Sequence, residues 1–469
     1  MVAIPVHAAP WLEPGDRRAR HALQQLVDGG LLQTSATTWP IPWADLPLET
    51  TASEHRAAER AYLVFEKERQ LVEGWTAEAS LGGASEPHVA AGFEENIPGE
   101  GFAAVEVEWS GRSLAAGIHA QGLWEPIEGD SLRLDGSYLA GTAGNWILGI
   151  GAVDRWWGPG WQSSLILSSN ARPIPSIWLQ RKETPAFETA WLSWLGPWQL
   201  ATFAGLLESD RTIEQPKLLG ARLTFRPLQG LDVGLSRILM IGGEGRPEGL
   251  STYWHAFIGR DNQQDGRDQD PGNQLAAIDL RYGRAFGAAS AGVYVQMAGE
   301  DEAGAFPAKK SWLLGFDSAL NLGDGAQQFY LEYVNTGAED LTADLLPNVT
   351  YEHGIYRSGY RYRGRALGAA VDGDSEAITL GAHQFFGGGS NAGVTLSYLR
   401  LNRDASNPSE APGPWPEQRQ SAGQITLNYG QAFWGGWVDT EVSWLSERVR
   451  YREAEIPRLS MAARYRYRF

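Results

Sequence analysis

The last eleven residues of the chain, LSMAARYRYRF, alternate between two kinds of side chain. One set is Leu459, Met461, Ala463, Tyr465, Tyr467 and Phe469, and the other is Ser460, Ala462, Arg464, Arg466 and Arg468. Successive side chains of a strand point to opposite faces, so the segment predicts a strand with one apolar and one ionic face. An apolar exterior around a polar lumen requires this division, and a terminal phenylalanine is typical of outer-membrane barrels. An amphipathic strand of a soluble β-sandwich is the alternative for this segment taken alone.

The same alternation recurs after Glu73. Phe329, Leu331 and Tyr333, for example, alternate with polar neighbours. Segments of about ten residues are separated in turn by short turns and long connections, which is the pattern of a transmembrane β-barrel. The short turns are SGR (110–112), TAGN (142–145), LGPW (195–198), PLQG (227–230), FGAAS (286–290), NLGDG (321–325), GGGS (387–390) and FWGGW (433–437).

Eight tight turns at one end of a barrel imply nine connections at the other, and hence about 18 antiparallel strands. The roughly 395 residues after Glu73 then supply about 22 residues for each strand and its connection. No apolar run approaches the ~18 residues that a membrane-spanning helix requires, so any insertion must use strands. We therefore expect a membrane all-β protein located in the cell outer membrane.

The segment before Glu73 has a helical pattern instead. Residues 16–28 place apolar side chains at helical spacing and stop at two glycines, and residues 53–72 carry a second apolar stripe. The proline-rich stretch between them predicts only a short helix that starts after Pro42. We expect an N-terminal helical periplasmic domain over residues 1–73 and a transmembrane barrel with long extracellular loops over residues 74–469. The start of the chain has no complete signal peptide, so we expect a mature form.

Composition excludes several classes of function. The net charge of −17 opposes general binding of nucleic acid, which requires a basic surface. The absence of cysteine excludes disulfides, thiolate metal sites and cysteine nucleophiles. The acidic run of residues 261–270 lacks the order of an EF-hand, so we expect a solvated loop, with no metal and no cofactor.

The 20 tryptophans are the most informative part of the composition. Three of them flank a Gly-Pro-Gly turn in DRWWGPGWQSSLILSSN, residues 154–170. If the helices stay in the periplasm, the strand near residues 75–81 runs outward, and the long connections at about 154–175, 243–273 and 337–375 face outside. Tryptophan rings stack on sugars, and arginine binds hydroxyls and carboxylates, so these connections favour a sugar ligand.

The third long connection interleaves arginine with tyrosine in YEHGIYRSGYRYRGRALG, and such a basic island in an acidic protein suits a polyanion. For each single residue, packing of the loops or pairing with lumen carboxylates is an equal alternative. The candidate polysaccharide-binding residues are Arg155, Trp156, Trp157, Trp161 and Arg172 in the first connection, Trp254 and Arg260 in the second, and Tyr360, Arg361, Arg363 and Arg365 in the third.

Three long blocks resemble the Wzi capsule-assembly family. They are DRWWGPGWQSSLILSSNARPIPSIWLQR, IGRDNQQDGRDQDPGNQLAAIDLRY and YEHGIYRSGYRYRGRALGAAVDGDS, and their order and the N-terminal helical segment also match. The resemblance covers nearly the whole chain. It implies an 18-stranded outer-membrane barrel whose inner end is closed by a periplasmic helical plug. It also implies a lectin that binds capsular or extracellular polysaccharide at the cell surface and helps capsule assembly or attachment.

Two other functions share parts of this pattern. A polysaccharide export conduit or a porin-like channel would use the same barrel but should be open. Capsule export machinery is a further candidate partner, whether the protein is a lectin or a conduit. An enzyme needs an acid/base pair or an activated nucleophile. Asp154, Glu183, Asp261 and Asp374 have no pairing spacing, and no GxSxG or histidine metal motif is present. We therefore expect a non-enzymatic protein whose partners are polysaccharide and outer-membrane lipid.

Overall fold

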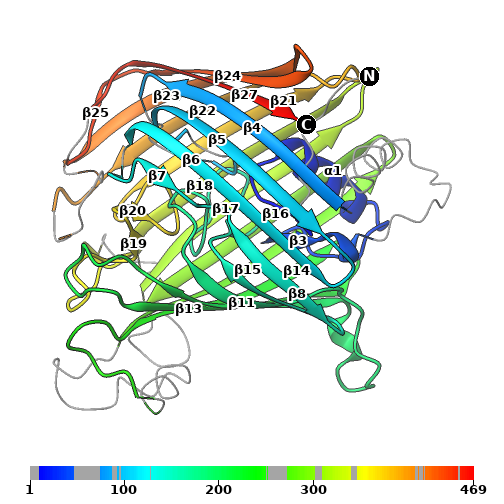
Figure 1. Ribbon diagram of the computed structural model, residues 1–469, viewed down its shortest axis with the longest axis horizontal. Helices are drawn as coiled ribbons and strands as arrows, with labels where there is room; N and C mark the ends of the chain where they lie inside the picture. Colours follow the sequence, from blue (N-terminus) through cyan, green and yellow to red (C-terminus); the bar gives the residue numbers. More distant parts are fainter. Residues whose placement is uncertain are drawn as a thin grey trace.

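The alternation of the last strand extends around the whole molecule, which in a computed structural model is a closed antiparallel barrel (Figure 1). The structure describes residues 10–46, 74–86, 92–94, 97–126, 128–249, 251, 272–300, 309–339, 346–406, 410, 416, 418–452 and 455–469. Eighteen strands of this described part form the wall, as the sequence predicts. The barrel closes where the last strand pairs with the first, with Tyr465 opposite Leu81.

The wall strands follow one another in chain order around the barrel. They are β4 (Gly74–Ala84), β5 (Gly99–Ser110), β6 (Leu114–Pro126), β8 (Tyr138–Ala143), β9 (Trp146–Gly151), β11 (Ser176–Arg181), β12 (Trp198–Leu206), β13 (Lys217–Leu228), β14 (Leu231–Ile241), β15 (Gly272–Phe286), β16 (Ala289–Glu300), β17 (Lys309–Leu320), β18 (Ala326–Glu339), β21 (Glu376–Phe385), β22 (Asn391–Leu401), β23 (Gln420–Phe433), β24 (Gly436–Leu445) and β27 (Leu459–Arg468). A two-residue strand, β7 (Leu132–Arg133), pairs with the end of β6.

Side chains alternate between the outside and the lumen along each strand. On β18, Leu331 is 46% exposed, whereas the next residue, Glu332, is 2% exposed. On β27, Met461 is exposed and Ser460 is buried. The outward set forms an apolar belt, which is the surface that lipid requires. The protein is therefore a membrane-spanning β-barrel.

Among the described residues, no helix combines the length and the apolar character needed to cross a membrane.

Seven of the eight predicted tight turns join neighbouring strands at one end of the barrel, which we call the short-turn end. The eighth prediction was wrong in extent. LGPW is only the last part of a connection of residues 182–197 between β11 and β12, which contains the 3-10 helix η2 (Ser193–Leu195). Nine connections lie at the opposite end, which we call the mouth. The described parts of the first and third long connections fold inward and form β10 (Trp156–Trp157), β19 (Arg361–Tyr362) and β20 (Arg365–Ala366). A small hairpin there pairs β25 (Val449–Arg450) with β26 (Glu455–Ile456).

The N-terminal segment lies inside the barrel near the short-turn end, where Figure 1 shows α1 surrounded by wall strands. The predicted first helix is confirmed as α1 (Arg17–Asp28), and the Asp16 carboxylate caps it by accepting the amide of Ala19 at 2.9 Å. The predicted short helix after Pro42 is the 3-10 helix η1 (Trp43–Asp45). Short strands complete the segment, namely β1 (Trp11–Leu12), β2 (Thr38–Trp39) and β3 (Ile41–Pro42). The helix predicted over residues 53–72 lies outside the described residues.

Wall side chains hold α1 in the lumen. Gln24 bonds to Asp317 of β17 at 2.5 Å, and the His21 ring contacts Gln328 of β18 at 2.7 Å. Polar groups buried inside a barrel need hydrogen-bond partners. The polar side chains of α1 supply such partners to the inward-facing polar residues of the strands. The described part of the N-terminal segment therefore occupies the lumen as a plug.

Candidate functional site

The three clustered tryptophans fold into the mouth and down to the plug. Trp156, Trp157 and Trp161 are at most 1% exposed. Trp156 pairs with Trp39 of β2 through a two-residue antiparallel bridge, which joins the first long connection to the N-terminal segment. The sequence predicts that the connection carrying these rings faces outside, and the structure places the rings folded into the mouth. Their faces are covered by protein, so in this conformation they offer no stacking surface to a sugar.

One buried arginine of the plug organises this aromatic group. The guanidinium carbon of Arg20 lies 4.4 Å from the ring centroids of both Phe93 and Trp161. The same guanidinium donates to the carbonyls of Pro159 at 2.9 Å and Gly160 at 2.7 Å. Burial lowers the pKa of Arg20 to about 10, so it keeps its charge at neutral pH. The Gly-Pro-Gly turn thus serves as an acceptor for a plug cation.

Arg155 and Tyr360 are also buried. Arg155 lies over the ring of Phe203 at 4.6 Å and donates to the Ser176 hydroxyl at 3.0 Å. Burial lowers the pKa of Arg155 to about 10. The Tyr360 hydroxyl donates to the carbonyl of Ile166 at 2.6 Å, which packs the third long connection onto the first.

Arg361 is separate from the other arginines of its connection. Its guanidinium donates to both oxygens of Asp372, at 2.9 and 2.6 Å, and to Glu352 at 2.6 Å. Burial alone would lower the pKa of Arg361, but the charges of Asp372 and Glu352 outweigh burial and raise it. Arg361 is therefore committed to the internal structure of its own connection.

Arg172, Arg363 and Arg365 do come together, as members of what we call the mouth cluster. Arg172 donates to both carboxylate oxygens of Asp135, at 2.7 and 3.0 Å, and to Asp130 at 2.7 Å. Arg363 pairs with the same Asp130 at 2.9 Å. The cluster consists of Arg133, Arg172, Arg363 and Arg365 with Glu128, Asp130 and Asp135.

The fold of three connections assembles this cluster. The carboxylates come from the connection between β6 and β8, Arg172 from the first long connection, and Arg363 from the hairpin of β19 and β20. Arg363 and Gly364 form the two-residue turn of that hairpin with φ of 51° and 80°, the geometry of a type I′ turn. This turn presents the Arg363 side chain, which is 33% exposed, at the surface of the mouth.

The pKa values of two carboxyl groups of the cluster are shifted in opposite directions. Desolvation raises the pKa of Glu128 above its usual range despite Arg365, Arg133 and Arg172. Partial burial would also raise the pKa of Asp130, but the hydrogen bond from Arg172 and the charge of Arg363 outweigh burial and lower it. Asp130, the more exposed of these two carboxyl groups, is therefore more strongly ionised than the buried Glu128.

The carboxylates of the mouth cluster are site residues that the sequence analysis missed. Glu128, Asp130 and Asp135 lie within the short connection IEGDSLRLDG, which has neither the length nor the tryptophans of the other connections. Three acidic residues between two predicted strands, at the same end as the basic island, were the available signal. Trp254 and Arg260 lie outside the described residues.

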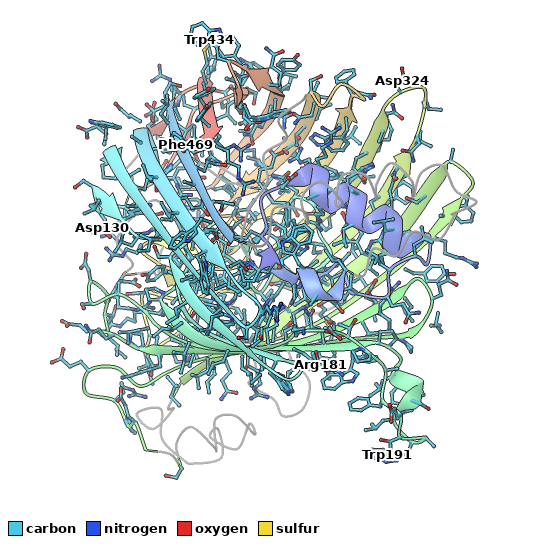
Figure 2. All side chains as sticks on the ribbon, turned by 45° about the vertical axis from the view of Figure 1, so that its right-hand side comes forward. Asp130, Arg181, Trp191, Asp324, Trp434 and Phe469 are labelled. Atoms are coloured by element: carbon cyan, nitrogen blue, oxygen red, sulfur yellow. The ribbon has the colours of Figure 1, made fainter. Side chains whose placement is uncertain are left out.

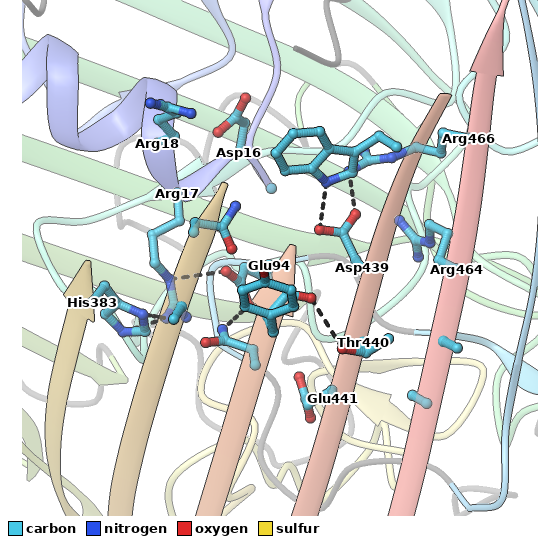
Figure 3. A pocket seen from close by; sticks show the side chains of 18 of the residues that line it. Asp16, Arg17, Arg18, Glu94, His383, Asp439, Thr440, Glu441, Arg464 and Arg466 are labelled. Carbon is cyan, nitrogen blue, oxygen red and sulfur yellow. Dashed lines mark hydrogen bonds and ion pairs between the residues drawn. The ribbon is translucent and has the colours of Figure 1, made fainter. Parts of the chain in front are cut away.

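Two polar cavities border the plug along one side of the wall. One, of about 170 Å³, extends from Arg172 and Arg365 of the mouth cluster past His119 to Arg464 and Arg466. The other, of about 160 Å³, lies beside α1, and both are lined by Ile97, Arg464 and Arg466. Figure 3 shows Arg17 of α1 between His383 and Glu94, and Arg466 beside Asp439.

This lining can bind and orient polar groups through charge. Asp439 accepts from the Trp437 indole at 2.8 Å and from Arg466 at 2.5 Å. In the part of the chain that the structure describes, no group of three or more acidic or histidine side chains is placed to hold a metal ion.

Comparison with known proteins places this geometry in a family. The family model for capsule assembly protein Wzi matches residues 73–454. The chain belongs to the Wzi family. A relative from Klebsiella pneumoniae, described as an uncharacterized 55.8 kDa protein in the cps region, is 33% identical over 340 residues. That match covers 70% of this chain and 66% of the relative, slightly under two thirds of its length.

The Wzi of Escherichia coli has a similar structure. The two chains superpose with a TM-score of 0.84 at 25% sequence identity, over 98% of this chain and 99% of the other. The Escherichia coli protein is an outer membrane protein involved in group 1 capsule assembly and is a carbohydrate binding β-barrel. The family resemblance expected from the three sequence blocks is therefore confirmed.

Proposed function

We propose that this protein is a non-catalytic lectin that binds capsular or extracellular polysaccharide at the cell surface and assists assembly or attachment of the capsule. Membership of the Wzi family and the carbohydrate binding of its Escherichia coli neighbour support the class of ligand. The mouth cluster is the observation that carries the proposal for this chain. It gathers four arginines from three connections at the mouth, the end that we assign to the cell exterior.

The mouth cluster suits an acidic ligand, which can compete with the carboxylates of the cluster for its arginines. Arg363 and Asp130 are both about one third exposed, so their ion pair is worth roughly 0–1 kcal/mol and is easily exchanged. A uronic acid or other acidic group of a polysaccharide can replace Asp130 on Arg363 at little cost. Each contact is weak, but repeated contacts along one polymer raise its retention.

The buried candidates have a supporting role in this proposal. Trp156, Trp157, Trp161 and Tyr360 pack the first and third connections onto the plug and onto each other. They keep the backbone that carries Arg172 and Arg363 in place. Arg155 and Arg361 serve the same purpose through their buried partners. Trp254 and Arg260 stay in the proposal as predicted contacts.

The experiment is co-sedimentation of proteoliposomes with capsular polysaccharide purified from the same cells, across a range of salt concentrations. Arg363→Gln with Arg365→Gln should weaken binding several-fold and flatten its salt dependence. Arg448→Gln with Arg458→Gln removes the same charge from exposed arginines at the same end and should change neither. Equal binding by both double variants would contradict the assignment of the mouth cluster.

A polysaccharide conduit or channel is the second candidate, and the two cavities that share Ile97, Arg464 and Arg466 favour it. Against it, α1 and two long connections occupy the lumen. Planar-bilayer recording should therefore show no stable conductance from the intact protein.

Catalysis is tested by incubating the protein with polysaccharide, which should leave the length of the polymer unchanged. Shortened polysaccharide chains would show that the protein is an enzyme and would contradict the proposal of a non-catalytic lectin. Capsule export machinery would meet the protein at the short-turn end.

A further inference from the structure

One connection at the short-turn end differs from all others there. Seven connections have only two to five residues between strands, whereas the connection between β11 and β12 has sixteen, from Lys182 to Pro197. We call this segment the rim loop. In Figure 1 the rim loop extends downward from the wall at the lower right, at the end of the barrel where α1 lies. Figure 2 shows Trp191 at its tip, away from the wall.

The base of the rim loop is firmly built. The Arg181 guanidinium lies 3.7 Å from the Trp198 ring centroid, and Phe187 stacks on the same ring with centroids 4.5 Å apart. The amide and hydroxyl of Thr184 donate to the Asp45 carboxylate of η1 at 2.7 and 2.8 Å. The base of the rim loop is therefore joined both to the wall and to the plug.

The tip of the rim loop is apolar and exposed. Trp191 is 71% exposed and Trp194 is 61% exposed. Two exposed indoles on a fixed support have a cost in water that a soluble surface normally avoids. Gly196 holds this tip against β13, since it has φ of 66° and a Cβ there would lie 2.0 Å from the Arg226 carbonyl oxygen.

The exposed tip is continuous with the lipid-facing wall. The Trp194 ring packs edge-on against Phe225 of β13, with centroids 6.2 Å apart. Phe225 belongs to the outward set of β13, because its neighbours Thr224 and Arg226 are buried in the lumen. Other exposed aromatic residues mark the same end of the barrel, namely Trp75, Phe286, Trp434 and Phe469.

We propose that the rim loop is a membrane anchor that lies in the interface of the periplasmic leaflet, with Trp191 and Trp194 at the level of the lipid headgroups. Tryptophan prefers this interface because its ring is apolar and its N–H can reach water. The anchor is joined to the plug through Thr184 and Asp45, so it sets the depth of the barrel and supports the inner end. The exposed tip is continuous with the lipid-facing wall, so we expect it to contact phospholipid rather than a protein partner.

The absence of cysteine from the sequence allows a clean test by single labelling. Ser193→Cys lies between the two tryptophans and preserves both, and Trp191→Cys and Trp194→Cys each place the label at the position of one of the two rings. Each variant is labelled with an environment-sensitive fluorophore and reconstituted in phosphatidylethanolamine and phosphatidylglycerol vesicles. Spin-labelled phospholipids carry the quencher either near the headgroup or deep in the acyl chain. Leu148→Cys on the outer face of β9 and Leu31→Cys after α1 are the lipid and water controls.

Labels at 191, 193 and 194 should lose fluorescence to the shallow quencher more than to the deep one, and the label at 148 should respond more strongly to the deep quencher. The label at 31 should respond to neither and should be quenched by iodide. Trp191→Ser with Trp194→Ser in the Ser193→Cys protein should reduce the shallow quenching while the barrel still folds. Labels on the rim loop that match position 31, or quenching that survives loss of both rings, would overturn the proposal. A match to position 31 would indicate a surface for a protein partner.

Discussion

Ion pairs between arginine and aspartate occur at both ends of the lumen but serve different purposes. Near the short-turn end, Arg281 of β15 binds Asp28 of the plug at 2.6 Å and Asp317 of β17 at 2.9 Å, and all three side chains are fully buried. At the mouth, Arg363 binds Asp130 at a similar distance of 2.9 Å, but both groups reach solvent. Distance alone does not distinguish a structural pair from an exchangeable one. Access to water does.

The physical reason is desolvation. Removing one partner of a buried ion pair leaves an uncompensated charge, which is costly, whereas water and salt replace the partner of an exposed ion pair. Under the proposed function, a polysaccharide should therefore compete for Arg363 but not for Arg281. We expect changes at the short-turn end to affect stability and changes at the mouth to affect binding.

The largest effect should come from Arg281→Ala. This change leaves Asp28 and Asp317 buried without their cation, and we expect release of the plug to become easier by about 3–5 kcal/mol. Hydrogen exchange of residues 17–28 in detergent micelles measures this change. Arg281→Lys keeps the charge and should lose less. Unaltered protection of α1 in the alanine variant would show that the plug does not depend on this pair.

The next effect should come from Arg20→Met, which removes hydrogen bonds to two carbonyls and cation–π contacts with three rings. We expect a loss of about 2–3 kcal/mol in the stability of the lumen packing. Thermal unfolding by near-UV circular dichroism follows the surrounding tryptophans. Below the unfolding temperature, polysaccharide binding should stay at the wild-type level. A direct loss of binding with intact packing would restore Trp161 and its neighbours as sugar contacts.

A smaller effect should follow pH at Asp374, a buried mouth carboxyl that accepts the Asn348 amide at 3.0 Å. Burial and the nearby charge of Asp404 raise the pKa of Asp374 to about 7 from its usual 3.8. The folded state therefore binds more protons between these values, so stability should fall as pH rises from about 4 to about 7 and then level off.

Asp374→Asn should remove this dependence and be more stable than wild type by about 1–3 kcal/mol at pH 8. Limited proteolysis of the third long connection at pH 5 and pH 8 measures the difference. Asp324→Asn in an exposed turn at the short-turn end is the matched control. Equal protection of wild type and Asp374→Asn at pH 8 would argue against a buried charge at this position.

The smallest effect on stability should come from Arg363→Gln, because its ion pair is exposed and contributes less than about 1 kcal/mol. The same variant should weaken binding of capsular polysaccharide and reduce the salt dependence of that binding. Arg361→Gln is the informative comparison. Because Arg361 holds the third long connection together, its loss should disorder that connection, and any loss of binding should follow from the disorder. If Arg361→Gln folds normally and Arg363→Gln binds normally, the comparison between buried and exposed arginines fails.

Local chemistry was sufficient to predict the wall. The alternation of β18 and β27 depends only on which neighbour faces lipid, and turns such as TAGN and PLQG contain their own glycines. The helix α1 was predictable within its observed bounds because Asp16 and the glycines that follow Asp28 delimit it. The rim loop was not, since the short motif LGPW gives no sign that its connection starts thirteen residues earlier, at Lys182.

The roles of the candidate residues depended on distant parts of the chain. Trp161 is covered by Arg20, and Trp191, with the same side chain, is left exposed at the tip of the rim loop. Arg361 and Arg363 are two residues apart, yet one is buried against Asp372 and the other meets Asp130 at the surface.

The sequence by itself determined the barrel, its number of strands, its apolar exterior and its family, because period-two alternation, short turns and the three family-like blocks are properties of neighbouring residues. Only the tertiary structure decided which tryptophans and arginines are accessible. Burial is a property of the whole fold, and the groups that bury or pair these side chains come from connections far away in the chain.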